Sequence, residues 1–387
     1  MPSKSVTLTG LSKTYGGATA VDGIDLSIEA GELFCLLGPS GCGKTTTLRM
    51  VAGLTSPTAG TVRIGGEDVT ATASANRDTS MVFQDWALFP RRTALENVAF
   101  GPKMAGVETE TRRERARSLL DTVDMAEYAD DLPAELSGGQ QQRIALARSL
   151  AVDPGVLLLD EPLSSLDKRL RQQMQLELMA IHDEVGTTHL HVTHDQDEAF
   201  TLGDRIGIMR DGELVQVGTP RAVYDDPETR FVEEFLGEVT ITTGEVTTVD
   251  RATATDTDTA VASTPPASDP GATAIQSVVE TPIGALPVPP ELSVSGTVSV
   301  SLRPEALDVT PTAETAATGD RHVTGTVADV LHRGSTVRYY LDVGADIEPF
   351  TEYSLRTDPE LTVGASVELS WEPGALRFFD ETGRRVR

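Results

Sequence analysis

The stretch Gly38-Pro39-Ser40-Gly41-Cys42-Gly43-Lys44-Thr45-Thr46 decides the fold of the first half of this chain. It fits the pattern Gly-x-x-x-x-Gly-Lys-Thr, whose glycines let the backbone curl so that several N–H groups point at one anion. The apolar run 33–37 before it predicts a buried strand, and residues 46–52 predict a helix whose N-terminus adds a positive dipole end. An ordinary glycine-rich turn would not need the Lys-Thr pair. We expect a nucleotide-binding phosphate loop, with Lys44 on the β- and γ-phosphates and the Thr45 hydroxyl on Mg²⁺.

Two acids close a second apolar run. Residues 156–159 are wholly apolar and are followed by Asp160 and Glu161, a pattern typical of a central parallel strand with functional groups at its end. Asp160 can hold Mg²⁺ through water, and Glu161 is suited to be the general base for a water that attacks phosphorus. Asp167 stands just before a predicted helix, where it either caps that helix or belongs to the nucleotide site.

Two further strand ends carry polar side chains. Gln84 closes the predicted strand 79–84, and His194 closes the predicted strand 188–194. Ligands of doubly wound sheets bind beyond the carboxyl ends of the strands, so we expect both side chains at the site, although a surface glutamine or a structural histidine would fit the pattern too. His189 and His191 have no companions suited to a metal site, and we expect them to face a packed side.

The segment Leu136-Ser137-Gly138-Gly139-Gln140 opens a predicted helix, with Ser137 as its N-cap. The two glycines leave backbone N–H groups for a phosphate. Tyr15, beside two glycines, is either a core residue or an exposed ring that stacks on a base, and its spacing leaves both open. The apolar cluster at residues 86–90 is either a satellite of the core or a docking surface.

The composition excludes several classes of protein. A net charge of −27 over 387 residues, with five lysines, repels nucleic acid and anionic lipid, so we expect no nucleic-acid partner. An acidic, lysine-poor surface also suggests a halophilic, haloarchaeal source. Cys35 and Cys42 are not placed for a disulfide. The N-terminus lacks the apolar core of a signal peptide, and no run approaches the roughly 18–20 apolar residues that cross a bilayer, which predicts a cytoplasmic chain that reaches membranes through a partner.

The character of the sequence changes beyond Gly237. Residues 251–274 are rich in Thr, Ala, Asp and Pro and predict a flexible insertion. Short alternating runs return from Ser277 onward, which predicts a small all-β domain resembling an OB barrel. We expect a nucleotide-binding domain over 1–237, with a helical subdomain at about 90–150, and the β-domain over 238–387.

In their order, these motifs resemble the ATPases of the ATP-binding cassette (ABC) family. Leu-Ser-Gly-Gly-Gln at 136–140 is the signature of that family, which other phosphate-loop proteins lack, and the resemblance covers roughly residues 4–237. It implies an α/β phosphate-loop NTPase core with a helical subdomain, ATP and Mg²⁺ as cofactors, and hydrolysis of ATP to ADP and phosphate.

The resemblance also implies roles for single residues. Tyr15 would stack on adenine, Gln84 would contact Mg²⁺ and the attacking water, and His194 would stabilise the γ-phosphate. Ser137 and Gly139, with their neighbours, would serve the nucleotide held by a second subunit. One chain leaves the γ-phosphate of its ATP exposed, so a facing helix N-terminus would cover it, and two copies would enclose two ATPs.

The tail narrows the resemblance to importers. Residues 302–307 are similar to a motif in the C-terminal TOBE domain of importer ATPases, for which the family implies dimer contacts or substrate sensing. Together with residues 83–90, this motif makes the chain most similar to the polyamine and ferric-iron branch of the importer ATPases. This implies as partners a second copy, two integral-membrane permease subunits at the cytoplasmic face of the membrane and, indirectly, an extracellular solute-binding protein. Importers of molybdate, sulfate, thiamine or sugar stay open, as do an exporter ATPase, a regulator without turnover and a soluble cassette protein of translation or repair.

Overall fold

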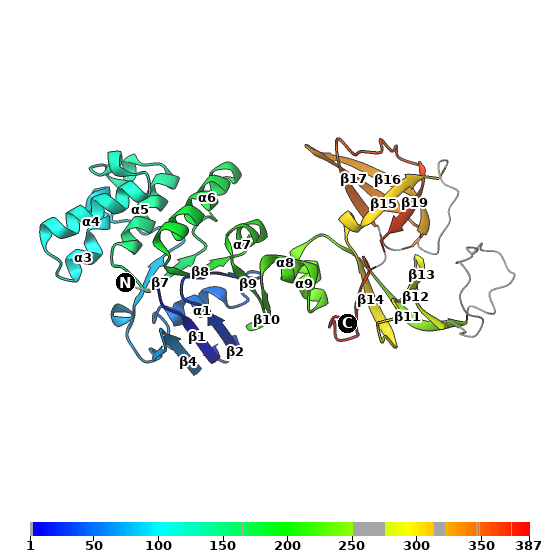
Figure 1. The fold of residues 1–387 in the computed structure, drawn as a ribbon, viewed down its shortest axis with the longest axis horizontal. Helices are drawn as coiled ribbons and strands as arrows, with labels where there is room; N and C mark the ends of the chain where they lie inside the picture. Colours follow the sequence, from blue (N-terminus) through cyan, green and yellow to red (C-terminus); the bar gives the residue numbers. More distant parts are fainter. Residues whose placement is uncertain are drawn as a thin grey trace. The chain divides into compact units, whose positions relative to one another are not determined.

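The computed structural model describes residues 3–164, 166–250, 275–312, 322–345, 347, 349–372 and 374–387 (Figure 1). The chain forms two compact units, residues 1–226 and 227–387. The predicted insertion at 251–274 lies outside the described residues. Every helix in the described part of the chain is too short or too polar to cross a lipid bilayer.

A mostly parallel sheet forms the centre of the first unit. Its strand order in the described residues is β10-β9-β3-β8-β7-β6. The bounds are β3 (Leu33–Leu37), β6 (Thr79–Val82), β7 (Val156–Asp160), β8 (Thr188–Thr193), β9 (Arg205–Arg210) and β10 (Glu213–Gly218). β3 and β7 are buried along their whole length, because a parallel sheet is covered on both faces. The β9–β10 hairpin turns at Asp211-Gly212, where both residues have positive φ, as the Asp-Gly pair predicts.

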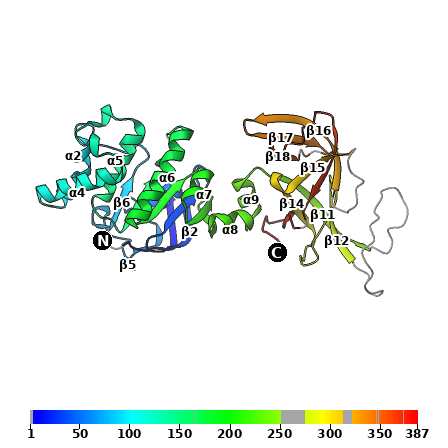
Figure 2. The same ribbon diagram turned by 45° about the horizontal axis from the view of Figure 1, so that its top comes forward.

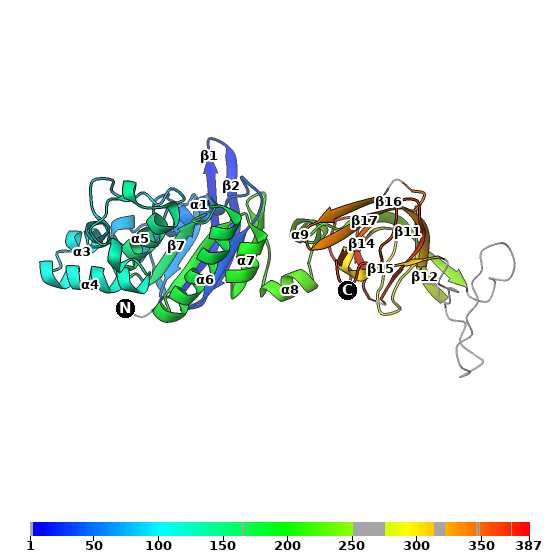
Figure 3. The same cartoon turned by 90° about the horizontal axis from the view of Figure 1, so that it is seen from above.

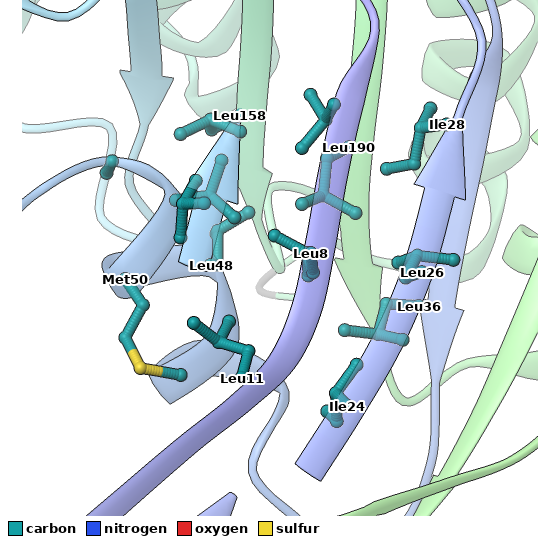
Figure 4. Packing of buried hydrophobic residues seen from close by; sticks show 14 of the residues in the cluster. Leu8, Leu11, Ile24, Leu26, Ile28, Leu36, Leu48, Met50, Leu158 and Leu190 are labelled. Carbon is teal, nitrogen blue, oxygen red and sulfur yellow. The ribbon is translucent and has the colours of Figure 1, made fainter. Parts of the chain in front are cut away.

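A second, antiparallel sheet packs with helix α1 (Lys44–Val51) against one face of the parallel sheet. Its strands are β2 (Ala18–Ile28), β1 (Val6–Tyr15), β4 (Ala59–Ile64) and β5 (Glu67–Asp68), in that order. Figure 4 shows the core between them, where side chains of β1, β2 and α1 meet those of the parallel strands. Each buried aliphatic side chain of this kind contributes about 1.5–3 kcal/mol, so this core fixes α1 and the loop before it.

Helices cover the other face of the parallel sheet and one end of the unit. α6 (Lys168–Val185) and α7 (Gln196–Leu202) lie side by side (Figure 3). His189 and His191 of β8 point toward them and are fully buried, as expected, while the alternate residues face the core with α1. Figure 2 shows α2 (Ala94–Val98), α4 (Thr109–Thr122) and α5 (Gly138–Leu150) grouped beside β6. α3 (Phe100–Met104) and α8 (Pro220–Asp225) complete the helices described in this unit.

The second unit is built of strands, apart from helix α9 (Arg230–Leu236) and a short 3-10 turn, which confirms the expected all-β character. In the described residues the strands form two five-stranded antiparallel sheets, β13-β12-β11-β14-β20 and β15-β19-β16-β17-β18. The bounds are β11 (Thr240–Asp250), β12 (Ile275–Thr281), β13 (Gly284–Pro287), β14 (Thr297–Leu302), β15 (Leu307–Pro311), β16 (His322–Arg333), β17 (Thr336–Asp342), β18 (Phe350–Ser354), β19 (Ser366–Trp371) and β20 (Arg377–Phe379).

A buried ion cluster explains why α9 belongs to the second unit, although the sequence suggested a boundary at Gly237. Glu233 of α9 is fully buried, and its carboxylate accepts hydrogen bonds from Arg303 at 2.8 Å, from Arg377 at 3.0 Å and from the Ser301 hydroxyl at 2.8 Å. A charge taken out of water needs such partners, so α9 is tied to the strands that supply them.

Candidate active site

The carboxyl ends of four neighbouring parallel strands lie at one edge of the sheet. The parallel registers pair Leu37 of β3 with Thr193 of β8, the last residue of β7 with Val192 of β8, and Val82 of β6 with Leu159 of β7, so neighbouring strands end within one residue of each other. The phosphate loop, His194, Glu161 and Gln84 follow these strand ends within two residues. The structure therefore brings to one edge the groups that the sequence placed there, which is where ligands of such sheets bind.

The phosphate loop is a close-packed turn that only glycine can make at two positions. A Cβ on Gly38 would lie 2.4 Å from the Met209 carbonyl oxygen, and one on Gly43 would lie 2.4 Å from the Ala20 carbonyl oxygen. Gly43 also has a φ of 108° and is the N-cap of α1. Lys44 is 5% exposed, and its ammonium donates to the carbonyl oxygens of Gly38 at 2.6 Å and Pro39 at 3.0 Å. The lysine is thus held inside the curl of the loop, where its charge favours an anion.

Thr45 and Asp160 join α1 to the end of β7. The Thr45 hydroxyl donates to Asp160 Oδ1 at 3.0 Å. Burial raises the pKa of the Asp160 carboxyl, against the opposing effect of the hydrogen bond from Thr45 and the charge of Arg49. One hydroxyl and one carboxylate are hard oxygen ligands, and Mg²⁺ is commonly held by one or two carboxylates together with substrate phosphates. The donor set therefore fits Mg²⁺ bound with a nucleotide.

Glu161 and His194 form a pair beside that position. His194 Nδ1 lies 3.0 Å from Glu161 Oε2, and the histidine side chain is about half exposed. Glu161 has a φ of 47°, a left-handed conformation that is uncommon for a residue with a Cβ, and its N–H donates to the Val192 carbonyl oxygen of β8 at 3.0 Å. The bond to the neighbouring strand holds the backbone in this conformation, so the direction of the carboxylate is set by the sheet.

Gln84 lies next to this pair through a residue that sequence reasoning did not single out. Gln84 Nε2 donates to Ser164 Oγ at 3.3 Å, and Ser164 Oγ donates to the Glu161 carbonyl oxygen at 2.9 Å. Ser164 thus connects the end of β6 to the end of β7. The only sequence feature that could have pointed to Ser164 is its position four residues after Asp160.

The Ser137–Gln140 segment is a well-capped helix start. Ser137 Oγ accepts the Gln140 N–H at 3.4 Å, and Gln140 Oε1 accepts the Ser137 N–H at 2.8 Å, which is a capping box. A Cβ on Gly139 would lie 3.2 Å from Leu170 Cδ1. A cavity of about 350 Å³ borders this helix start and is lined by Ser137, Gly139, Gln140, Tyr128, Arg143 and Gln173, among others. Among the described residues, no hydrogen bond of this segment reaches the phosphate loop of the same chain.

The structure shows which local role Tyr15 and Asp167 have. Tyr15 ends β1 with 49% of its surface exposed, and its ring is covered only in part by Lys13, whose ammonium lies 4.9 Å from the ring centroid. It is therefore an exposed ring and not a core residue. Asp167 accepts the Leu170 N–H at 3.0 Å and caps α6, so its structural role is established whatever else it does.

Arg77 is a second residue that sequence reasoning missed. It is 6% exposed, and its guanidinium donates to the carbonyl oxygens of Met50 at 2.7 Å and Val51 at 2.8 Å, at the C-terminal end of α1. It also donates to the carbonyl oxygens of Thr70 and Thr72. Arg77 thus caps the helix whose other end carries Lys44 and Thr45. A lone arginine after a loop gives no signal for such a role in the sequence.

The two cysteines lie in β3 and in the phosphate loop. Cys35 and Cys42 are both free and buried. Within the described ranges, no group of three or more His, Cys, Asp or Glu side chains is arranged to hold a metal ion without a nucleotide.

Comparisons with known proteins identify the relatives of both units. The ABC transporter family model matches residues 21–164, and the TOBE domain model matches residues 300–379. A spermidine/putrescine import ATP-binding protein of Thermobifida fusca is 43% identical over 375 residues, which cover 95% of this chain and 92% of that protein. An Fe(3+) ions import ATP-binding protein of Brucella abortus is 39% identical over 93% of this chain and 95% of its own length.

A solved structure resembles the first part of the chain. It is the dimeric, post-hydrolysis state of the ATP-binding cassette MJ0796 bound to ADP and Pi, with 34% sequence identity and a TM-score of 0.50. The match covers 56% of this chain and 99% of that one.

Proposed function

This chain belongs to the ATP-hydrolysing import subunits of ABC transporters, with an ABC ATPase core and a C-terminal TOBE domain, and we propose that it powers the uptake of a polyamine or of ferric iron. Relatives that match nearly the whole chain are named for spermidine and putrescine or for Fe(3+), which supports these two cargoes. The hydrogen-bonded pair of Glu161 and His194 beside the phosphate loop is the observation that carries the mechanism.

The phosphate loop binds the triphosphate of ATP in this proposal. The loop N–H groups and the N-terminus of α1 face the phosphates, and Lys44 neutralises the β- and γ-phosphates from within the curl. Thr45 and Asp160 would hold Mg²⁺. When bound, Mg²⁺ neutralises phosphate oxygens as charge develops on them. The exposed Tyr15 ring stacks on adenine.

The hydrolytic step uses the ends of β7, β8 and β6. Glu161 accepts the proton of the attacking water, a role of general base that is typically worth about 10²–10⁴-fold in rate. His194, hydrogen-bonded to the carboxylate of Glu161, orients it and faces the γ-phosphate. Gln84, hydrogen-bonded to Ser164 beside Glu161, would position the water and help to hold Mg²⁺.

A second copy of the chain completes the site. The N–H groups at the start of α5 are held in place by the capping box of Ser137 and Gln140, next to a cavity that the described residues of the chain's own phosphate loop do not line. We propose that Ser137, Gly138 and Gly139 cover the γ-phosphate of the ATP bound to the partner copy. The dimeric state of the similar cassette, with its ADP and Pi, supports this arrangement.

We also propose that the dimer acts on two membrane permease subunits, which would place it at the cytoplasmic face of the membrane, with a solute-binding protein outside. Importer relatives and the apolar side chains after Gln84 support this. Phe83 is 37% exposed there, whereas Phe89 packs against Phe100 with a centroid distance of 4.4 Å. Trp86, Leu88 and Phe89, the side chains expected to form a seat for a short helix, are all partly buried, and Phe83, just before Gln84, is the exposed apolar residue beside them.

The test is a trapped dimer. Glu161→Gln should bind ATP and Mg²⁺ but lower turnover by about 10²-fold or more, and the chain should elute as a dimer in gel filtration with ATP. The double variant with Glu161→Gln and Lys44→Ala is the control, and it should stay monomeric in gel filtration with ATP. Undiminished turnover, or a chain that stays monomeric with ATP and its permease, would refute the mechanism. The cargo is tested by calorimetry of the co-encoded solute-binding protein, which should bind spermidine, putrescine or Fe³⁺. If it binds none of these, the proposed cargo is wrong.

A further inference from the structure

We propose that Trp86 is a positioning residue that links the start of helix α5 to the hydrolytic groups at the ends of β6 and β7 in the same chain. The inference rests on the proposed roles of Gln84 and Glu161. It concerns how these two side chains are placed, and it gives the apolar residue at 86 a function inside the chain.

The backbone at Trp86 and Ala87 is held in an unusual conformation by α5. Both residues have positive φ, 56° and 44°, which is unfavourable for residues with a Cβ and persists only where the surroundings impose it. Arg148, in the last turns of α5, supplies that restraint. Its Nη2 donates to the Trp86 carbonyl oxygen and its Nη1 to the Ala87 carbonyl oxygen, both at 2.7 Å. The loop after Gln84 is therefore fastened to the helix that Ser137 begins.

The Trp86 side chain reaches the end of β7. Its indole Nε1 donates to the Pro162 carbonyl oxygen at 3.3 Å, and Pro162 follows Glu161 directly. Gln84, two residues before Trp86, reaches Ser164 on the same segment. Two bonds thus join the loop of Gln84 to the residues that carry Glu161.

The other edge of the indole ring meets Gly138. A Cβ built on Gly138 would lie 3.1 Å from Trp86 Cη2, which is tighter than an ordinary contact, and 3.6 Å from Cζ3, which is an ordinary contact. Gly138 does not have positive φ, so backbone conformation does not require glycine there. The space taken by the indole ring gives a separate reason for glycine at this place, in addition to the N–H group that the sequence analysis assigned to it.

These contacts make the indole ring a spacer between the helix start and the catalytic segment. A shift of Gly138 toward the ring presses on the indole, which is held on its other side by the bond to Pro162 and at its backbone by Arg148. The displaced ring changes the position of Pro162 and of the loop that bears Gln84. The start of α5 therefore affects hydrolysis within its own chain, in addition to the partner's nucleotide.

The test is a size compensation in the full-length chain. Gly138→Ala should lower kcat by about tenfold, because the new methyl group pushes on the indole. Trp86→Phe, which lacks the atoms nearest to Gly138 and the Nε1 donor, should itself lower kcat several-fold with KM for ATP nearly unchanged. In the Trp86→Phe background, the added Gly138→Ala should cost less than about threefold. Equal costs of Gly138→Ala in both backgrounds would overturn the proposal.

Fluorescence gives a second readout that needs no turnover. The chain has two tryptophans, Trp86 and Trp371, so Trp371→Phe leaves Trp86 as the single emitter and is also the matched Trp-to-Phe control for activity. In that background, Gly138→Ala and Arg148→Lys should each change the quenching of Trp86 emission by acrylamide, and unchanged quenching in both would contradict the link. If instead Gln84→Ala and Glu161→Gln retain full turnover, the proposed mechanism fails while the quenching result still stands or falls by itself.

Discussion

His194 Nδ1 lies 3.0 Å from Glu161 Oε2, so the two side chains assigned to hydrolysis are bonded to each other across neighbouring strands. His194 follows the end of β8, and in the part of the chain that the structure describes its side chain pairs with the Glu161 carboxylate, with no hydrogen bond to the phosphate loop. This geometry predicts that the histidine acts on the chemical step and not on nucleotide binding.

The first prediction is therefore that His194→Ala separates turnover from binding. Loss of the partner of Glu161 should lower kcat by roughly 10²-fold, within the usual range for groups that assist proton transfer. The Kd for ATP should stay within about twofold, because Lys44 and Thr45 are untouched. Steady-state kinetics and equilibrium binding of a fluorescent ATP analogue measure the two effects. A large rise in Kd with normal kcat would contradict the assignment.

The second prediction concerns the cost of keeping Asp160 at the site. Burial raises the pKa of its carboxyl, so the ionised form is disfavoured in the folded chain. The carboxyl therefore lowers the stability of the fold, and this loss develops as the pH rises through the pKa of the folded state. Asp160→Asn keeps an acceptor for Thr45 and should raise Tm at pH 7 in Mg²⁺-free buffer, while Mg²⁺-dependent turnover is lost. The difference in Tm should vanish below about pH 4, where the native carboxyl is protonated. A lower Tm of the variant at pH 7 would show that the carboxylate stabilises the fold.

The third prediction tests the cap of α1. Arg77→Met removes a donor from two buried backbone carbonyls, of Met50 and Val51, and from two partly buried ones, and it should lower the free energy of unfolding by about 3 kcal/mol, since an unsatisfied buried acceptor costs about 1–3 kcal/mol and water can reach some of them. Urea unfolding measures it. Arg63→Met, at an exposed position of β4, is the matched control and should change stability by less than about 0.5 kcal/mol. Equal losses of stability in the two variants would show that the hydrogen bonds of Arg77 to α1 do not stabilise the chain.

The fourth prediction concerns the buried carboxylate of the second unit. Burial alone would raise the pKa of Glu233, but hydrogen bonds and charges of Arg303 and Arg377 outweigh it and lower the pKa. A lowered pKa gives stability that is fully present above the unfolded value of about 4.3 and is lost as the pH falls through the folded value. Glu233→Gln should cost about 3–5 kcal/mol, because the buried Arg303 and the partly buried Arg377 both lose the carboxylate that they contact.

In a Trp86→Phe background Trp371 is the single tryptophan, and its emission follows unfolding of the second unit, in which it lies. Glu234→Gln on the same helix removes a half-exposed i,i+4 pair with Arg230 and is the control, with an expected loss of under about 0.5 kcal/mol. Stability of Glu233→Gln should also depend less on pH between about 5 and 3 than that of the native chain. If the stability of the variant fell with pH as steeply as that of the native chain, carboxylates other than Glu233 would cause the pH dependence.

The sequence was sufficient for the parts of the site whose cause is local. The phosphate loop, the acids after β7 and the cap at Ser137 each depend on a few adjacent residues, and the parallel-sheet rule then predicts that strand ends meet. The sequence did not reveal that α9 belongs to the second unit, and it did not reveal that the Trp86 ring lies against Gly138. Arg148 lies 62 residues from Trp86, and Arg377 lies 144 residues from Glu233. Contacts between residues so far apart leave no periodic or motif signal, because only the packed chain brings them together.

The concealed thiols make the chain suited to site-specific labelling. Burial raises the pKa of both Cys35 and Cys42, so little thiolate is present at neutral pH to react with a maleimide dye. A cysteine introduced at the exposed Glu110 of α4 would be the reactive one. Mixing donor- and acceptor-labelled chains would then report the meeting of two copies, and its timing against ATP turnover, by energy transfer in solution.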